Sequence, residues 1–351
     1  MGRSSWLVVV CLLLALTNAN PHPKAHANIH ARARPQQYYA NPYNQGSPSS
    51  SAPASVNTGV DGDGDGSTTT GTTSTSVGDI KFPAGCASKN GYHIGVQMDG
   101  DPSPLKQSMG AYPCIYGRFA DIATMEGISD GVTNANNIGA ILMLSLKTTT
   151  YNVNAASVAS QLNNMAKTVK AGVWLRLGHE MTMNGPEGNY PHNGKPDIAA
   201  YVKLWQDIAG AVDRTKIKTY WCANPPTLAN QNWNDLSWMN QYYPGDAAVD
   251  IAGIDTYAED GNAKFQYGLA PEFCKKYGNK PIFVGELGVK DGGDASTKLS
   301  WATQALSSQV KGAPQNCGSY IGFSWFEISK DNHDYRAAGN GILKNAMAAA
   351  Q

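Results

Sequence analysis

Eight short apolar runs restrict what this chain can fold into more than any other feature. They begin near residue 90, contain six to nine residues each, and are almost continuously apolar instead of alternating with polar residues. Such runs indicate parallel strands that are buried on both faces of a sheet. The runs are residues 93–98, 114–119, 138–146, 173–181, 217–225, 249–257, 281–289 and 320–328.

Helical patterns lie between these runs, clearest in residues 157–171 and 196–214. Strands that alternate with helices predict βα units, and eight units in one domain predict a (β/α)8 TIM barrel. A doubly wound open sheet is the alternative fold. It is disfavoured because no glycine-rich phosphate loop follows the first run.

The chain divides into three parts by composition. Residues 1–19 resemble a signal peptide, with Arg3, an apolar stretch at residues 6–16 and small residues before the expected cleavage site. The apolar stretch is shorter than the roughly 18 residues that a membrane span needs, so we expect a secreted protein with no membrane segment after cleavage. Residues 20–79 are rich in Ser, Thr, Gly and Asp, which predicts disorder. Residues 80–351 are expected to form the barrel.

The charges are balanced, with 27 basic and 27 acidic residues and no large block of one sign. A nucleic acid or an anionic membrane surface is therefore not expected as a partner. We expect a monomer.

Six cysteines are present, and Cys11 leaves with the signal peptide. An odd number in a secreted protein predicts disulfides and one free thiol. Cys222 lies in the middle of an apolar run, so we expect it to be buried and free. The predicted disulfides are Cys86–Cys114 and Cys274–Cys317. No C-x-x-C is present, so a zinc ribbon or thioredoxin-like site is not expected.

Several runs end in polar or aromatic side chains that suit an active site better than a dry core. In a (β/α)8 barrel, the catalytic residues lie at the C-terminal ends of the strands. The fourth and seventh runs lie across the barrel from each other, so Glu180 and Glu286 are predicted to face one another. Two carboxyl groups about 5–5.5 Å apart are what a retaining glycosidase uses. The other residues of this kind are His179, Asn224, Asp255, Thr256, Tyr257, Trp325 and Glu327.

Six stretches, in order from about residue 90 to the end, match one known family. The domain resembles the clan A glycoside hydrolases and, within them, family 26, whose best-known members are β-mannanases. The matching stretches are Arg176–Met181, Trp221–Pro225, Tyr242–Asp246, Val249–Tyr257, Lys280–Gly288 and Phe323–Trp325.

This resemblance implies roles for the residues at the ends of the runs. Glu180 would be the acid/base and Glu286 the nucleophile. His179 would hold the acid or contact the sugar beside the scissile bond, and Tyr257 would hydrogen-bond the nucleophile.

The resemblance also implies positions for four further residues. Trp325 would form a stacking floor under the sugar ring. Arg176 would lie beneath the carboxylates, and Asn224 and Trp221 would line the cleft.

One departure from the family concerns the loop after the acid. Family members usually have Asn-Gly directly after His-Glu-Met, whereas Thr182 and Met183 intervene here. The substrate and the number of subsites therefore stay open.

Three classes of function follow from these patterns. The first is a secreted endo-acting glycosidase on a β-linked polysaccharide, with mannan as the first choice and β-1,3-1,4-glucan or β-1,3-xylan as alternatives. The second is a non-catalytic carbohydrate-binding barrel. The third is a zinc hydrolase, which is disfavoured because Met183 stands where H-E-x-x-H needs its second His. We expect no metal and no cofactor.

Overall fold

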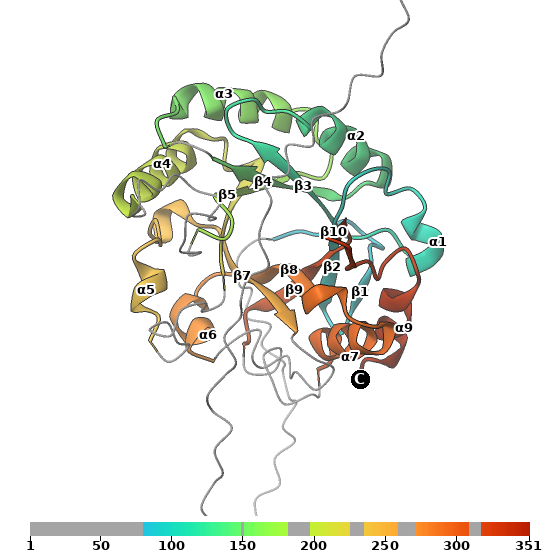
Figure 1. The fold of residues 1–351 in the computed structure, drawn as a ribbon. Coiled ribbons are helices and arrows are strands. Elements are labelled where there is room, and N and C mark those ends of the chain that lie inside the picture. The colour runs from blue at the N-terminus through green and yellow to red at the C-terminus, as the bar shows by residue number, and fades with distance from the viewer. Residues whose placement is uncertain (1–79, 149–150, 182–196, 225–234, 259–270, 309–316) are drawn as a thin grey trace, which may run out of the picture. The chain divides into compact units, whose positions relative to one another are not determined.

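The computed structural model describes residues 80–148, 151–181, 197–224, 235–258, 271–308 and 317–351 (Figure 1). The predicted signal peptide, the predicted disordered segment and the loop that carries Thr182 and Met183 lie outside the described residues.

Eight parallel strands form a closed barrel, as the eight apolar runs predict. Neighbours in sequence pair in order, and β9 pairs back to β2 with His93 opposite Gly322 and Gln97 opposite Phe326. The barrel strands are β2 (Tyr92–Gln97), β3 (Ile115–Asp121), β4 (Ile141–Lys147), β5 (Val173–Leu177), β6 (Ile217–Ala223), β7 (Ile251–Ala258), β8 (Ile282–Val289) and β9 (Tyr320–Phe326). The closed ladder excludes the open-sheet alternative.

Helices surround the barrel on its outer side (Figure 1). Three of them begin at an Asx cap: the side chains of Asn154, Asp197 and Asp294 accept a hydrogen bond from the backbone N–H three residues later. The α-helices are α1 (Leu105–Met109), α2 (Ile128–Ile138), α3 (Ala155–Ala166), α4 (Ile198–Ala211), α5 (Ser237–Asn240), α6 (Pro271–Tyr277), α7 (Ala295–Leu306) and α9 (Ile342–Ala349).

Short elements complete the described part of the chain. They are the strands β1 (Ser88–Lys89), β10 (Ser329–Lys330) and β11 (His333–Asp334) and the 3₁₀ turns η1 (Asp246–Ala248) and η3 (Lys290–Gly292).

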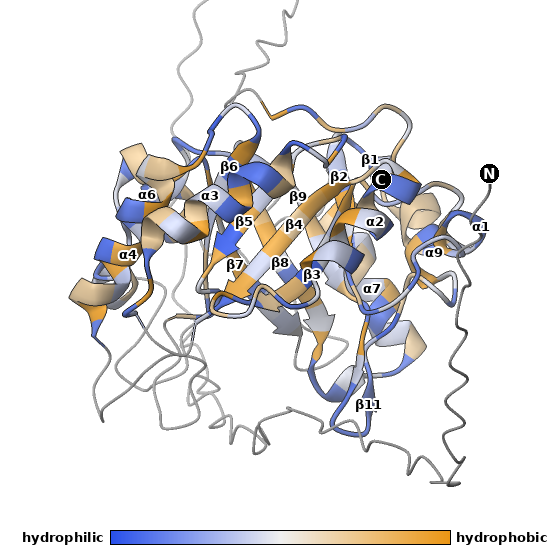
Figure 2. Cartoon of the chain, turned by 90° about the horizontal axis from the view of Figure 1, so that it is seen from above, coloured by the Kyte–Doolittle hydropathy of each residue, from blue (hydrophilic) through white to orange (hydrophobic). Residues whose placement is uncertain are grey.

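The apolar residues form two separate clusters, one outside and one inside the barrel. The outer cluster fills the space between strands and helices and contains Trp205 and Trp301. The inner cluster contains Met143, Trp174 and Phe283. Both faces of a strand such as β4 are therefore buried, which explains why β4 is hydrophobic along most of its length (Figure 2).

Two disulfides are present in the described part of the chain, and both are the predicted pairs. Cys86 bonds to Cys114 and Cys274 bonds to Cys317, while Cys222 is free and buried, also as predicted. Closing loops of 28 and 43 residues stabilises a fold by about 3–4 kcal/mol each in the chain-entropy description.

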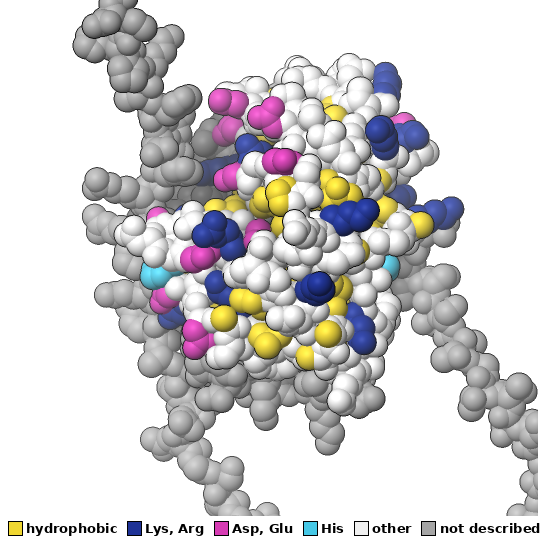
Figure 3. Space-filling model, turned by 90° about the vertical axis from the view of Figure 1, so that its right-hand side faces the viewer, with side chains coloured by type: hydrophobic (Ala, Val, Ile, Leu, Met, Phe, Trp, Pro, Cys, Tyr) yellow, Lys and Arg dark blue, Asp and Glu magenta, His cyan; other side chains and the backbone are white. Residues whose placement is uncertain are grey.

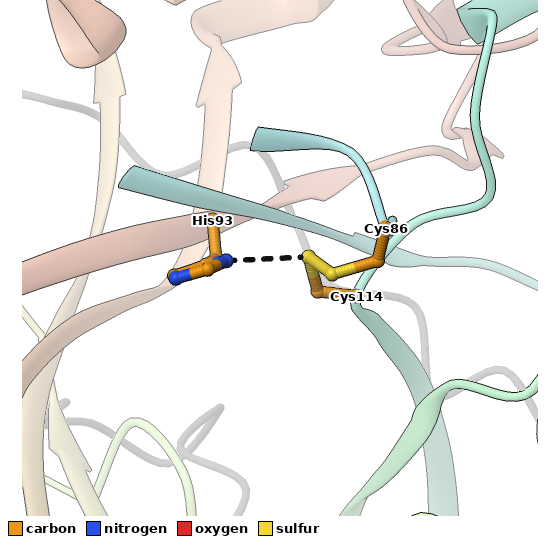
Figure 4. Close-up of side chains that lie close together, drawn as sticks. All are labelled: Cys86, His93 and Cys114. Carbon is orange, nitrogen blue, oxygen red and sulfur yellow. Dashed lines mark hydrogen bonds between the residues drawn. A yellow bond between two sulfur atoms is a disulfide. The ribbon is translucent and has the colours of Figure 1, made fainter. Parts of the chain in front are cut away.

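The Cys86–Cys114 disulfide lies beside a histidine (Figure 4). The Nδ1 atom of His93 is 3.5 Å from Sγ of Cys114. The three side chains are close enough to suggest metal ligands. However, the two sulfurs are bonded to each other and are not thiolates, so the cluster is a structural disulfide with a packed histidine.

The surface carries charges of both signs. One face of the molecule displays Lys or Arg and Asp or Glu side chains, with small groups of hydrophobic side chains among them (Figure 3). Among the described residues, no helix has an apolar stretch long enough to cross a membrane.

Candidate active site

A buried arginine lies at the centre of the polar residues in the barrel. Arg176 on β5 is fully buried, and its Nη1 donates to Oε1 of Glu286 over 2.6 Å. Nη2 forms an ion pair with Oδ2 of Asp255, and Nη1 also contacts Oγ of Ser145 at 3.3 Å. The family resemblance implied that Arg176 lies beneath the carboxylates, and in the structure it contacts two of them directly.

This arrangement compensates a charge that would otherwise be costly to bury. A cation removed from water destabilises the fold unless anions and acceptors surround it. Burial by itself lowers the pKa of Arg176, but the negative charges of Asp255 and Glu286 outweigh it and hold that pKa above its usual value. Arg176 therefore stays charged and holds Glu286 in place.

Glu286 reaches the barrel interior through an irregularity in β8. The pairing register of β8 with both neighbours shifts near this residue, which is typical of a β-bulge. Gly285 precedes it, and a Cβ there would lie 2.7 Å from Sγ of Cys222 and 2.8 Å from Oδ1 of Asp255. Only glycine leaves room for those two groups. The backbone of β8 can therefore lie against Cys222 and Asp255, and the next side chain, Glu286, reaches Arg176.

Tyr257 on β7 holds the second oxygen of Glu286. Its hydroxyl donates to Oε2 of Glu286 over 2.8 Å. Burial and the nearby Glu286 charge raise the pKa of Tyr257 well above its usual value, so the hydroxyl keeps the proton that it donates. This is the contact that the resemblance implied.

Glu180 does not lie in a strand, which corrects the prediction that residues 173–181 are one strand. β5 ends at Leu177, and both Gly178 (φ 60°) and Glu180 (φ 57°) adopt left-handed backbone conformations. A glutamate rarely adopts this conformation, and such strain is common at functional sites. The backbone N–H of Glu180 donates to the carbonyl of Cys222, which attaches the turn to β6.

The turn brings Glu180 to the other two carboxylates. One carboxylate oxygen of each of Glu180, Asp255 and Glu286 lies within 4.8 Å of the others. Burial, and then the Glu286 charge, raise the pKa of Glu180 to about 7, while a hydrogen bond from Asn224 opposes this shift. Asn224 therefore lies beside Glu180, a contact that the resemblance, which placed Asn224 in the cleft lining, did not specify.

His179 is buried next to Glu180. Its ring lies 5.1 Å from that of Phe119, and only 6% of the residue is exposed. Burial and the positive charge of Arg176 lower the pKa of His179 well below its usual value. His179 is therefore a neutral imidazole near pH 7.

The structure contradicts the expectations that Trp221 lines the cleft and that Trp325 forms a stacking floor under the sugar ring. Both residues are 0% exposed and belong to the outer cluster between strands and helices. Nε1 of Trp221 donates to the carbonyl of Tyr242, and Nε1 of Trp325 donates to that of Tyr335. Neither ring presents a face to a sugar.

Phe326, the residue after Trp325, faces the barrel interior, where the aromatic residue of this strand was predicted to lie. Successive side chains on a strand point to opposite faces, so Phe326 faces inward when Trp325 faces outward. The ring of Phe326 lies 5.9 Å from that of Tyr257, which contacts Glu286. Phe326 is thus the aromatic residue of β9 that lies beside the site.

Asp255 and Cys222 contact the buried charges of the site, although neither was given a role in the predicted site. Asp255 ends an apolar run and precedes Tyr257 by two residues, so strand periodicity places both on one face. Cys222 was expected to be merely buried, but its Sγ lies 3.2 Å from Oδ1 of Asp255.

The three carboxylates are close enough to suggest a cation site, but Arg176 already occupies it. The guanidinium binds one oxygen of Asp255 and one of Glu286. This positive charge repels a metal ion and already neutralises charge on two of the three carboxylates, so the cluster is explained by the Arg176 ion pairs without a metal.

A closed (β/α)8 barrel in which two glutamate carboxylates lie close together is an arrangement that retaining glycoside hydrolases use. The sequence profile of Glycosyl hydrolase family 26 matches residues 108–284, half of the chain, and the protein belongs to this family.

Solved structures agree with this fold. A modular endo-β-1,4-mannanase from Cellulomonas fimi is similar with a TM-score of 0.53 and 18% identity, over 74% of this chain and 70% of its own. The catalytic domain of a family 26 endo-β-1,4-mannanase from Bacillus sp. JAMB-750 is similar with a TM-score of 0.53 and 16% identity, over 74% of this chain and 87% of its own. No curated protein sequence matches the chain.

Proposed function

We propose that this family 26 glycoside hydrolase is a secreted endo-β-1,4-mannanase that retains the anomeric configuration, with Glu180 as acid/base and Glu286 as nucleophile. The observation that carries the proposal is the approach of Glu180 and Glu286 oxygens to within 4.8 Å. Retaining enzymes hold their carboxyl groups about 5–5.5 Å apart, whereas inverting enzymes need about 6.5–9.5 Å to admit a water.

In the first step, Glu286 attacks the anomeric carbon while the bond to the leaving oxygen breaks. Arg176 and Tyr257 each hold one oxygen of the Glu286 carboxylate, which fixes its orientation for attack. Glu180 has a pKa of about 7, so it is protonated in mildly acidic solution and gives its proton to the leaving oxygen.

In the second step, a water releases the sugar from Glu286. The ester has no negative charge, so the repulsion that raises the pKa of Glu180 disappears once it has formed. Glu180 then becomes the better base, takes a proton from the water, and the water attacks the anomeric carbon. The same residue therefore acts as acid and then as base.

Mannan is the proposed substrate because two similar solved structures are described as endo-β-1,4-mannanases. β-1,3-1,4-glucan and β-1,3-xylan are the alternatives. The N-terminal 19 residues support secretion, and a polysaccharide outside the cell is the partner that a secreted monomeric enzyme would meet.

The test is to incubate the purified protein with β-mannan, mixed-linkage β-glucan and β-1,3-xylan, with and without a strong chelator. We expect manno-oligosaccharides whose new reducing ends have the β configuration in early NMR spectra, at the same rate with the chelator present. A 2-fluoro mannoside should add its glycosyl mass to the peptide that contains Glu286.

Four results would overturn the proposal. Release of glucose or xylose oligosaccharides alone would change the substrate. Early appearance of the α anomer, or a label on another carboxylate, would refute the mechanism. Binding of mannan without hydrolysis would indicate a carbohydrate-binding barrel.

A further inference from the structure

The free thiol of Cys222 lies inside the barrel, directly behind the candidate active site. Cys222 is 1% exposed, and its Sγ lies 3.2 Å from Oδ1 of Asp255. The missing side chain of Gly285 makes the space for this contact, since a Cβ there would approach both groups to less than 3 Å.

The thiol is the donor in this contact. Burial raises the pKa of the Cys222 thiol well above its usual value, so it keeps its proton. The hydroxyl of Tyr220 also lies near Sγ, at 3.4 Å, but it is 2.7 Å from the carbonyl oxygen of Phe283. A hydroxyl has one proton, and the shorter bond to the carbonyl takes it. Burial raises the pKa of Asp255 above its usual value, but the Arg176 guanidinium in contact with Oδ2 favours the charged carboxylate. The thiol proton is therefore directed to Oδ1 of Asp255.

Asp255, whose orientation the thiol fixes, is connected to Glu286 through Arg176. Its other oxygen, Oδ2, forms the ion pair with Nη2 of Arg176, whose Nη1 donates to Glu286. Both oxygens of Asp255 thus have a donor, which a fully buried carboxylate requires. Without the thiol, Oδ1 loses the donor seen among the described residues, and the carboxylate turns toward another one.

We propose that Cys222 is a positioning residue for Glu286, because its thiol fixes Asp255, which orients Arg176 and through it the nucleophile. The inference rests on the proposed function, since it takes Glu286 as the reacting group. Cys222 itself touches no substrate.

The test compares Cys222→Ala, which removes the donor, with Cys222→Ser, which keeps one. Thr219→Val is the matched control. Thr219 lies on the same strand and is 0% exposed. Its hydroxyl donates over 2.7 Å to the carbonyl of Ala248 and lies 3.2 Å from Oδ2 of Asp250, a carboxylate that is not part of the active-site cluster. Active sites are counted by labelling with a 2-fluoro mannoside, so that kcat refers to folded protein only.

We expect Cys222→Ala to lower kcat by about tenfold with KM changed less than about twofold, because a small misplacement of a reacting group costs rate more than binding. Cys222→Ser should recover kcat to within about threefold of the original protein. Thr219→Val should lower the melting temperature and leave kcat per active site unchanged.

Other outcomes would overturn the inference. An unchanged kcat in Cys222→Ala would show that the thiol does not position Glu286. An equal loss in Cys222→Ser would show that packing, and not the hydrogen bond, matters. If Cys222→Ala does not fold, Cys222→Val removes the donor while filling the space, and an unchanged kcat there has the same meaning. If the unaltered protein neither hydrolyses mannan nor becomes labelled, the proposed function itself has failed.

Discussion

The two ends of the barrel interior contain opposite kinds of side chain. At the end where the strands begin, the ring of Phe82 stacks on that of His93 at 3.6 Å and meets the edge of Trp174 at 5.8 Å. At the end where the strands finish, Arg176 lies between two carboxylates. The first end is an apolar and aromatic plug, and the second is a cluster of buried charges.

The two ends therefore serve different purposes: the aromatic end contributes to stability, and the charged end contributes to the reaction. Buried aromatic contacts contribute to stability through the area that they remove from water. Buried charges contribute little net stability but fix geometry and shift pKa values. Substitutions at the plug should therefore change stability with little effect on rate. Substitutions in the charge cluster should lower the rate, and those that leave Arg176 without a partner should lower stability as well.

Removing the nucleophile should give the largest effect. Glu286→Ala should lower kcat by at least about 10⁴-fold, because no other group can form the glycosyl ester. It is measured as oligosaccharide release from mannan, with circular dichroism as the check on folding. Retaining activity that survived in a folded variant would mean that the reacting carboxylate is another one.

Removing the acid/base should give a smaller and rescuable loss. Glu180→Ala should lower kcat on mannan by about 10²–10⁴-fold. Aryl mannosides with good leaving groups need no acid, so their first step should be almost unaffected, and azide should restore turnover. The azide product should be the β-mannosyl azide, and an α product would contradict the double displacement.

A substitution in the plug should leave the chemistry intact. Phe82→Ala removes the ring that stacks on His93, and we expect it to lower the free energy of unfolding by about 2 kcal/mol, since Phe82 is only half-buried. Urea unfolding measures this loss, and kcat per active site is compared at a temperature where both proteins are folded. A tenfold loss of kcat would show that the two ends are coupled.

The apolar runs predicted the barrel, and the polar residues in them predicted the approach of Glu180 and Glu286, for a physical reason. The place of Arg176 beneath them came from the family resemblance. Parallel strands buried on both faces are nearly continuous apolar runs, so a charged residue in or beside a run, such as Arg176 or Glu286, is conspicuous. The same continuity hides which face each residue occupies. Trp325 and Phe326 are both aromatic and adjacent, and without a period of two the sequence could not assign the inward face to Phe326.

The sequence also could not predict the contacts between residues of different strands. The left-handed turn at Glu180 depends on tertiary contacts, including its bond to the carbonyl of Cys222, because local preference opposes that conformation. The thiol contact of Cys222 with Asp255 joins residues 33 positions apart and follows no motif.

The smallest predicted effect concerns the pH dependence set within the charge cluster. Glu180 must be protonated to act as the acid, and its pKa is raised to about 7 by burial and by Glu286. The kcat/KM of the unaltered protein should therefore fall as pH rises through about 7.

Asn224 hydrogen-bonds the Glu180 carboxylate and lowers the pKa of Glu180. Asn224→Ala removes that stabilisation of the charged form, so the pKa of Glu180 should rise and the alkaline limb should move to higher pH. The measurement is kcat/KM on a soluble manno-oligosaccharide between pH 4 and 9, with Phe82→Ala as the control, whose alkaline limb should coincide with that of the unaltered protein. A shift to lower pH in Asn224→Ala, or an equal shift in Phe82→Ala, would show that the limb does not report the titration of Glu180.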